Sequence, residues 1–387
     1  MPLSAMRLVD YAPYSQGDAR TVLSRRTIII GSGLVAAGAG AGYLAWPHGD
    51  DGYRDAVKAN RRPLTPIGGS AIPAAELVRY ATLAANSHNT QPWLFEARNG
   101  TIRIRPDPAR RCPVVDPEDR HVVASLGCAM ENLVLAAEAA GLAADVIFHD
   151  PDRAASISLT TSKARSVPAF DAITRRQSTR APFDPAPLAP DELLAIEAAI
   201  AMPGVRARFL TARGDLDRLK DFVVQGNTAQ CEDADFVDEL RHWVRFNPDH
   251  AAETGDGLYA GATGNPAIPR WLGRSLFPFV ITAGGENPKY VAQIDGSAGA
   301  LILYAETDEP AGWFNLGRAS QRFQLEATAR DIRTSFVNQP VEVSAVRSEF
   351  SAWLGDGLRP ALILRFGHGD ALPVSLRRPV SAVLTES

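Results

Sequence analysis

Two clusters of polar side chains in this sequence could bind a ligand. Residues 85–93, Ala-Asn-Ser-His-Asn-Thr-Gln-Pro-Trp, place five small polar side chains before a Pro-Trp pair. They follow an alanine-rich helical pattern and precede an alternating strand pattern. Such a turn can supply fixed hydrogen-bond donors to a planar, heteroatom-rich ligand. It can equally be an Asx-rich turn whose side chains satisfy their own backbone.

The second cluster is basic. Residues 175–180, Arg-Arg-Gln-Ser-Thr-Arg, hold three arginines and two hydroxyls. Arginine offers a planar fork of donors to phosphate oxygens, so the cluster could bind a phosphate group. The alternative is a solvated basic helix end.

Other chemistries find no support. The sequence has no His-Glu-x-x-His, Cys-x-x-Cys or Gly-x-Ser-x-Gly motif, and its three cysteines lack metal-like spacing. We therefore predict neither a metal site nor a protein nucleophile. The net charge is −4 and the charges are interspersed, so nothing indicates a nucleic-acid partner.

The elements that must position these clusters fall into two halves of α+β type. In residues 53–165 we predict helices at 53–60, from Pro73 onward and at 117–140, with a strand at 145–149. Asn99-Gly100 between alternating runs predicts a β-hairpin.

In residues 166–387 we predict helices at 170–180, 191–201, 216–246 and 312–330, and strands at 206–211, 293–304 and 359–366. Residues 247–274 are rich in Gly, Pro and Asp without a clear period, which indicates a candidate lid. The similar outline of the two halves suggests a diverged duplication, although no residue-level repeat is visible.

The first 46 residues suggest targeting. Arg25-Arg26 before a mildly apolar run resembles a twin-arginine export signal. Residues 28–36 also fit the opening of a dinucleotide-binding unit, but no second strand follows, which favours the signal. Thr27–Trp46 is just long enough to anchor the chain in a membrane, and signal cleavage is left open. Because this route exports folded proteins, commonly with their cofactor inserted, a cofactor is expected.

With these residues in place, the chain resembles the FMN-dependent nitroreductase family, and within it the Acg-like tandem branch. Residues 176–180 resemble the family's Arg-x-Ser-x-Lys/Arg motif, and residues 84–93 resemble its Ala-Pro-Ser-x-x-Asn-x-Gln-Pro-Trp motif. The family's Pro-Ser is Ala85-Asn86 here. Family members are α+β homodimers that hold FMN between protomers.

The two motifs occur here in reversed order and in different halves. The first half has Arg61-Arg62-Pro63 in place of the arginine motif, and the second half has residues 199–205 in place of the Asn-x-Gln-Pro-Trp motif. The resemblance therefore implies two tandem nitroreductase-like domains that form an intramolecular pseudo-dimer, a monomer with one FMN.

The resemblance also implies residue roles. Arg176 and Ser178 would hold the FMN phosphate and ribityl chain, and Arg180 would face the N1/O2 edge of the ring. Arg377 or Arg378 would add a phosphate contact. Asn86, Ser87 and Asn89 would contact the ring, and Asn338-Gln339 would present a backbone N–H to it.

Two functions follow from this resemblance. The first is an oxidoreductase that reduces a nitroaromatic, quinone or similar small acceptor. The second is a flavin-sequestering protein with a lidded site and little turnover. Export by the twin-arginine machinery would place either one in the periplasm or on the outer face of the cytoplasmic membrane, where NAD(P)H is scarce.

Overall fold

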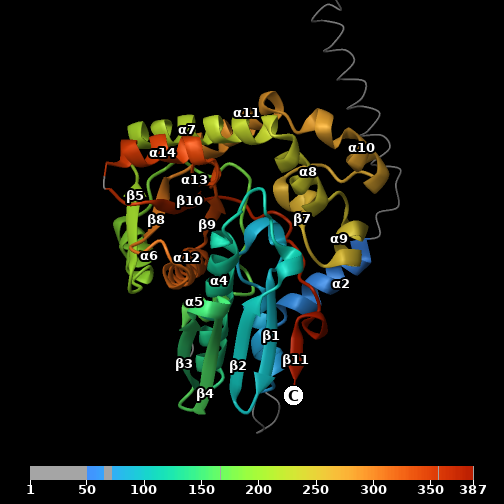
Figure 1. The fold of residues 1–387 in the computed structure, drawn as a ribbon, viewed down its shortest axis with the longest axis vertical. Helices are drawn as coiled ribbons and strands as arrows, with labels where there is room; N and C mark the ends of the chain where they lie inside the picture. Colours follow the sequence, from blue (N-terminus) through green and yellow to red (C-terminus); the bar gives the residue numbers. More distant parts are fainter. Residues whose placement is uncertain (1–49, 65–71, 166, 356, 387) are drawn as a thin grey trace, which may run out of the picture. The chain divides into compact units, whose positions relative to one another are not determined.

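The computed structural model describes residues 50–386 apart from 65–71, 166 and 356 (Figure 1). Residues 48–387 form one compact unit. The described part of this unit contains helices and predominantly antiparallel sheets, which confirms the α+β class. The export signal and the anchor at Thr27–Trp46 lie outside the described residues and stay predictions.

The α-helices are α2 (Asp50–Arg61), α3 (Ala74–Thr82), α4 (Arg120–Ala139), α5 (Pro168–Ala172), α6 (Pro190–Ala199), α7 (Arg213–Glu232), α8 (Ala234–Trp243), α9 (Pro248–Thr254), α10 (Arg270–Val280), α11 (Ala283–Asp295), α12 (Pro310–Ala329), α13 (Gln339–Glu342) and α14 (Ser344–Leu354). The strands are β1 (Trp93–Arg98), β2 (Thr101–Pro106), β3 (Leu142–His149), β4 (Ala154–Thr161), β5 (Val205–Leu210), β6 (Val244–Arg245), β7 (Leu258–Tyr259), β8 (Gly299–Ala305), β9 (Ile332–Phe336), β10 (Pro360–His368) and β11 (Leu384–Glu386).

The first sheet has the order β11-β1-β2-β4-β3. Asn99 and Gly100 join β1 to β2 with φ values of 50° and 74°, so the predicted hairpin is confirmed. Strand β4, which the sequence reading missed, pairs with both β2 and β3. Strand β11 comes from the far end of the chain and pairs in parallel with β1.

The second sheet has the order β5-β8-β10-β9, and every neighbouring pair in it is antiparallel. This repeats the order and directions of β1-β2-β4-β3 in the first sheet. The difference lies between the first two strands. A two-residue turn joins β1 to β2, whereas residues 211–298, with helices α7 to α11, connect β5 to β8.

Helices α4 and α12 pack against each other in the centre of the molecule (Figure 1). Each is 20 residues long and carries a glycine at its eighth position, Gly127 or Gly317. A Cβ at Gly127 would clash with the carbonyl oxygen of Phe314, and a Cβ at Gly317 would clash with that of Ala124. Ala124 and Phe314 are both the fifth residues of their helices, so the crossing is reciprocal, as in a two-fold interface.

The buried apolar residues follow this arrangement. One core joins α3, α4 and the first sheet, and includes the fully buried Trp93. The second sheet has a core on each face: Phe222 of α7 and Phe350 of α14 belong to one, and Phe323 of α12 belongs to the other. Both faces of the second sheet are therefore covered, which holds its strands in fixed positions.

Residues 247–274, the candidate lid, contain α9, β7 and the start of α10, and the lid stays a prediction. Two sequence predictions need correction. Residues 175–180 are not helical, because helix α5 ends at Ala172 and the Thr179 N–H donates instead to the Thr334 carbonyl of β9 (2.9 Å). Residues 293–295 end helix α11, so the buried strand predicted at 293–304 begins at Gly299.

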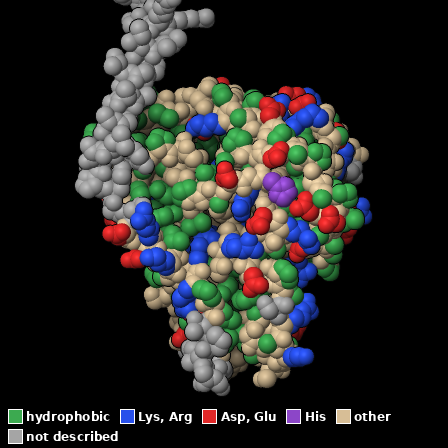
Figure 2. All heavy atoms as spheres, turned by 180° about the vertical axis from the view of Figure 1, so that it is seen from behind, with side chains coloured by type: hydrophobic (Ala, Val, Ile, Leu, Met, Phe, Trp, Pro, Cys, Tyr) green, Lys and Arg blue, Asp and Glu red, His purple; other side chains and the backbone are tan. Residues whose placement is uncertain are grey.

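Among the described helices, α4 alone is long and apolar enough to cross a membrane, but 83% of that stretch is buried inside the protein. A core helix passes the same test, and α4 lies in the first core. Acidic and basic side chains both occur across the face shown in Figure 2, with apolar side chains between them.

Candidate functional site

The polar stretch 85–93 adopts an unusual backbone conformation. Three of its residues, His88, Asn89 and Gln91, have positive φ values of 46°, 52° and 55°. The Asn86 side chain holds this turn, since its Oδ1 accepts from the Gln91 N–H (2.9 Å). Left-handed backbone is sparsely populated by such residues, and strain of this kind is concentrated at functional sites.

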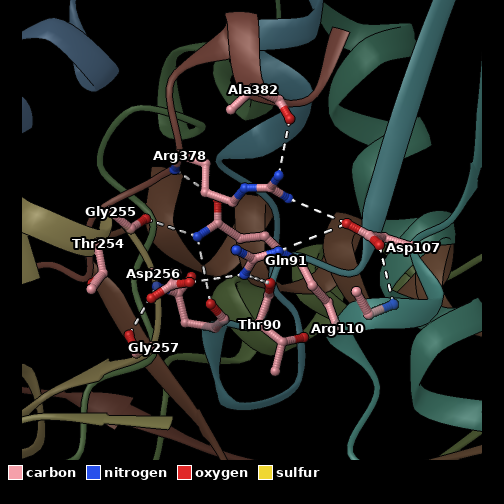
Figure 3. Close-up of polar contacts among 12 residues, drawn as sticks. Thr90, Gln91, Asp107, Arg110, Thr254, Gly255, Asp256, Gly257, Arg378 and Ala382 are labelled. Carbon is pink, nitrogen blue, oxygen red and sulfur yellow. Dashed lines mark hydrogen bonds and ion pairs between the residues drawn. The ribbon is translucent and has the colours of Figure 1, made fainter.

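Two amides of this stretch bind backbone from the second half of the chain. Asn89 Nδ2 donates to the carbonyls of Gly257 (2.9 Å) and Leu376 (3.0 Å). Gln91 Nε2 donates to the carbonyl of Gly255 (2.9 Å), as Figure 3 shows. The Asn89 amide, predicted to contact a flavin ring, is therefore occupied in joining the two halves.

A buried ion-pair cluster fixes the same connection. Asp256 pairs with Arg110 (2.8 Å) and Arg245 (2.6 Å), and Figure 3 shows it beside Gly255 and Gly257. Burial alone would raise the pKa of this carboxyl, but the two guanidinium groups outweigh burial and lower it. Residues 255–257, part of the predicted lid, are thus bonded into the fold as a fixed wall.

Four arginines converge on a small cavity of about 50 Å³ beside this wall. Its lining includes Arg61 from the first half and Arg176, Arg180 and Arg377 from the second, and it includes no carboxylate. Burial and the neighbouring cation lower the pKa of Arg61 to about 10, and burial does the same to Arg176. Cations that are buried, as Arg176 and Arg377 are, or half-buried, as Arg61 and Arg180 are, and that have no carboxylate in the cavity lining are expected of an anion site.

The individual arginines differ in how far they are bonded. Arg176 donates to Gln324 Oε1 (3.1 Å) and to the Leu83 carbonyl (3.0 Å), but its buried Nε has no partner. Across the described part of the chain, the Arg180 guanidinium has neither a hydrogen bond nor an ion pair. Burial lowers its pKa. Both arginines therefore keep donors available for a ligand.

Arg377 and Arg378 point to different places. Arg377 is buried at the arginine cavity and donates to Asn89 Oδ1 (2.8 Å) and to the Thr82 carbonyl (2.5 Å). Arg378 donates to the Ala382 carbonyl (2.9 Å) and lies 3.6 Å from Asp107 (Figure 3). Arg378 lines none of the cavities described here, so of the two predicted phosphate contacts the structure places Arg377 alone at the site.

A larger cavity of about 190 Å³ adjoins the arginine cavity and shares Ala85, Asn86, Ser178, Arg180 and Leu258 with it. Ser87 of the first motif also lines it, as do Asn338 and Gln339 at the start of α13. The two motifs that lie about 85 residues apart in the sequence thus meet at one continuous site. Of the eight predicted residues, Arg378 is the one that the structure leaves outside.

The larger cavity also contains titratable groups that sequence reasoning missed. Burial raises the pKa of Glu342, whose Oε2 accepts from Gln230 Nε2 (2.8 Å) and whose Oε1 lies 3.8 Å from His121 Nδ1. Burial, with the positive charge of Arg180, lowers the pKa of His88 to about 4. Glu342, His121 and His88 come from α13, α4 and residues 85–93, so no local spacing could have indicated them.

Arg61 is the other missed residue. It ends α2, and its Nη1 donates to the carbonyls of Thr174 (2.8 Å) and Arg176 (3.1 Å). The sequence offered one signal, since Arg61 stands where the first half would carry its own arginine motif. Within the described residues, no group of three His, Cys, Asp or Glu side chains could hold a metal ion.

Comparison with known proteins adds to this geometry. No model of a protein family matches the chain. A Mycobacterium tuberculosis protein named "Putative NAD(P)H nitroreductase Rv3131" is 29% identical over 332 residues, which cover 81% of this chain and 92% of the relative. "Putative NAD(P)H nitroreductase acg" from the same organism is 24% identical, over 83% of this chain and 97% of the relative.

The chain also has a weak likeness to solved nitroreductase structures. The FMN-dependent nitroreductase NfnB from Mycobacterium smegmatis, in complex with NADPH, has 19% identity and a TM-score of 0.35 over 56% of this chain and 91% of its own. A nitroreductase with bound FMN from Bacteroides fragilis has 14% identity and a TM-score of 0.32, over 53% and 90%. Over most of its length, the chain is similar in sequence to proteins named as NAD(P)H nitroreductases.

Proposed function

We propose that this chain is an FMN-dependent oxidoreductase of nitroreductase type that holds one FMN between its two halves and reduces a small acceptor by two electrons. The arginine cavity carries this proposal. Four arginines from both halves line it without a carboxylate, and Arg176 and Arg180 keep unpaired donors. A phosphate group would supply the missing negative charge and accept those donors. The names of the relatives support the same class.

Each part of FMN would have its own cavity residues. Arg176, Arg61 and Arg377 line the arginine cavity and would surround the phosphate, and Ser178 lies where this cavity meets the larger one. Asn86, Ser87 and Arg180 would then face the ring. Bound FMN supplies the two-electron chemistry, and a cation at Arg180 favours the negatively charged reduced ring over the oxidised one.

A single FMN is proposed because two aromatic rings pack together at the second, equivalent position. The larger cavity is lined by Ala124 of α4 and by Asn338, which lies nine residues beyond the end of α12. The matching positions in the other half are Phe314 of α12 and Phe148, nine residues beyond the end of α4. Their rings lie with centroids 5.0 Å apart, which supports one FMN position rather than two. Flavin absorbance against protein concentration should give one FMN per chain; two would contradict the proposal.

The absorbance spectrum of the purified protein tests the function directly. We expect a flavin spectrum that bleaches on addition of NADPH or NADH and recovers on addition of nitrofurazone or menadione. A protein without flavin absorbance and without affinity for added FMN would overturn the proposal.

Flavin sequestration is the second candidate, and the fixed wall at residues 255–257 favours it. Asn89, Gln91 and Asp256 bond this wall into the fold, so it would hold FMN in place rather than open with each turnover. Sequestration predicts bound FMN that NAD(P)H does not reduce and that, once reduced by dithionite, neither acceptor reoxidises. Reoxidation within seconds would exclude it.

Export and assembly state complete the proposal. We propose that the twin-arginine machinery exports the chain as a monomer to the periplasm or the outer face of the cytoplasmic membrane. NAD(P)H is scarce there, so a quinol or a partner protein would serve as donor. Replacing Arg25-Arg26 with Lys-Lys should keep the protein in the cytoplasm, as cell fractionation would show, and gel filtration should give the mass of one chain.

A further inference from the structure

A second chamber of about 270 Å³ adjoins the larger cavity. The two share Arg180, Leu240, Leu258, Ile281, Glu286, Tyr290 and Phe336. The rest of its wall comes from β6, residues 260–268, α10 and α11, all within the insertion between β5 and β8. The corresponding turn of the first half is two residues long, so this chamber has no counterpart there.

Away from Arg180 and Tyr290, which the chamber shares with the larger cavity, its wall is apolar because its other polar side chains already have partners. Lys289 pairs with Glu286 (2.8 Å) and donates to Asn265 Oδ1 (3.2 Å). Gln293 Nε2 donates to the Arg180 carbonyl (2.8 Å). The remaining wall of the chamber is formed mainly by aliphatic and aromatic side chains, among them Leu240, Val244, Phe246, Ile268, Leu276 and Phe277. A polar ligand would lose its water there without gaining hydrogen bonds, whereas a hydrocarbon would be transferred favourably.

The chamber also reaches an apolar part of the surface. Leu276 and Val280 of α10 line it and are 38% and 55% exposed, and Phe279 on the same helix is 79% exposed. Helix α10 lies at the edge of the molecule next to α8 (Figure 1). A hydrocarbon chain could thus enter between side chains that present apolar surface both inside and outside.

We propose that this chamber binds the hydrocarbon chain of a lipophilic acceptor, of the class of alkyl- or prenyl-substituted quinones, whose ring lies in the adjoining cavity beside Arg180. The placement of the ring rests on the proposed function, whereas the binding of the chain does not. The chamber would therefore select among acceptors by the length of their apolar substituent, since each buried methylene adds to affinity.

The test compares two quinones that share a ring, 2,3-dimethoxy-5-methyl-1,4-benzoquinone without a chain and decylubiquinone with one. Binding to the full chain is followed by calorimetry, with 1-decanol as a competitor that has no redox ring. We expect decylubiquinone to bind at least about tenfold more tightly than the chain-free quinone, and 1-decanol to displace it. Equal affinity for the two quinones would overturn the proposal.

Variants at Leu276 locate the chain in the chamber. Leu276→Trp fills the chamber and Leu276→Asp makes its wall charged, and the partly exposed position tolerates both. Each should weaken decylubiquinone binding about tenfold or more and leave the chain-free quinone and FMN unaffected. Phe279→Ala on the same helix is the control, because Phe279 does not line the chamber.

The outcomes of these experiments distinguish a failure of the chamber proposal from a failure of the proposed function. Unchanged decylubiquinone binding in both Leu276 variants would indicate adsorption to the surface and would overturn the chamber assignment. A protein that binds decylubiquinone and 1-decanol with the expected dependence but never binds FMN would keep the chamber and contradict the flavin function.

Discussion

At the scale of single residues, the arginines of the site differ from others in the described chain because they have no acidic partner. Surface arginines of this chain pair with acids, as Arg175 does with Asp331 (3.2 Å). Its neighbour Arg176 is buried next to Arg61 and Arg377 and has an unbonded Nε. Burial of like charges is costly, so this cluster supports the proposal that an FMN phosphate neutralises it.

The neighbouring arginines allow a matched test. Arg176→Ala should weaken FMN binding about tenfold to a hundredfold, because a charge-assisted bond contributes roughly 1.5–3 kcal/mol. Arg175→Ala removes the same side chain one residue away, at an exposed position, and should leave FMN affinity unchanged. Fluorescence titration of the apoprotein with FMN measures both. Equal effects in the two variants would mean that Arg176 does not contact the phosphate.

His88 predicts a pH dependence of stability. Its pKa falls to about 4 in the folded protein, mainly through burial, whereas an unfolded histidine has a pKa of about 6.5. As the pH falls from about 6.5 to 4, the unfolded chain takes up a proton that the folded protein does not, so the free energy of unfolding decreases. His250 has a similarly lowered pKa and acts in the same direction.

Urea unfolding at pH 7 and pH 5 checks this prediction. His88→Asn keeps a residue that tolerates the left-handed backbone and removes the ionisable ring. The variant should lose less stability between the two pH values than the parent does. A loss as large as the parent's would show that His88 can be protonated in the folded protein.

At the scale of elements, the crossing of α4 and α12 decides how the halves meet. The glycines at Gly127 and Gly317 let the two backbones touch, and the α12 side chains Gln321 and Gln324 then reach the site. Gln321 Oε1 accepts from the Ala85 N–H (3.2 Å), and Gln324 holds Arg176. A wider crossing would move both motifs relative to each other.

Gly317→Ala should therefore destabilise the protein and weaken FMN binding together. Its Cβ would meet the backbone of Ala124, which cannot give way as a side chain can, and overpacking of this kind costs about 1–3 kcal/mol. Gly214→Ala in α7 is the control, since nothing lies within 4 Å of its Cβ and alanine favours the helix. Thermal unfolding of both variants distinguishes steric conflict from a general effect of replacing helical glycine.

The wall at residues 255–257 depends on one buried carboxylate. Asp256→Asn would leave Arg245 without its counter-charge and Arg110 with Asp107 alone at 3.8 Å, and breaking a buried pair in this way costs about 3–5 kcal/mol. Glu253→Gln, which changes an exposed acid of the same segment paired with Arg270, should have little effect. If chemical denaturation finds the two variants equally stable, the ion pairs do not hold the wall.

At the scale of the whole molecule, what could be predicted from the sequence is what local patterns encode. The Asn99-Gly100 hairpin and the long helices near 120–139 and 310–329 are visible in turn residues and apolar spacing. Most residues of the site lie far apart in the sequence. Arg61 and His121 reach the cavities because the sheets bring distant elements together, and strand β11 joins β1 for the same reason.

Residues 85–93 show the limit of prediction from residue type. Their polar composition left open whether they bind a ligand or satisfy their own backbone, and in the structure some of their side chains bond to the protein while others line a cavity. Asn86 bonds to the turn itself, Asn89 and Gln91 bond to the second half, and Ser87 faces the larger cavity. Residue type alone cannot assign such roles, because all of these side chains carry similar donors and acceptors.

The bonds from Asn89 to Leu376 and from Arg378 to Gln91 each span 287 residues of chain. A ribosome adding about 5–20 residues per second takes roughly 15 to 60 s to make that length. The first motif therefore leaves the ribosome long before its C-terminal partners exist, and Asn89 and Gln91 gain these two bonds only once residues 376–378 have been made. The proposed FMN would then bind late in the production of this protein.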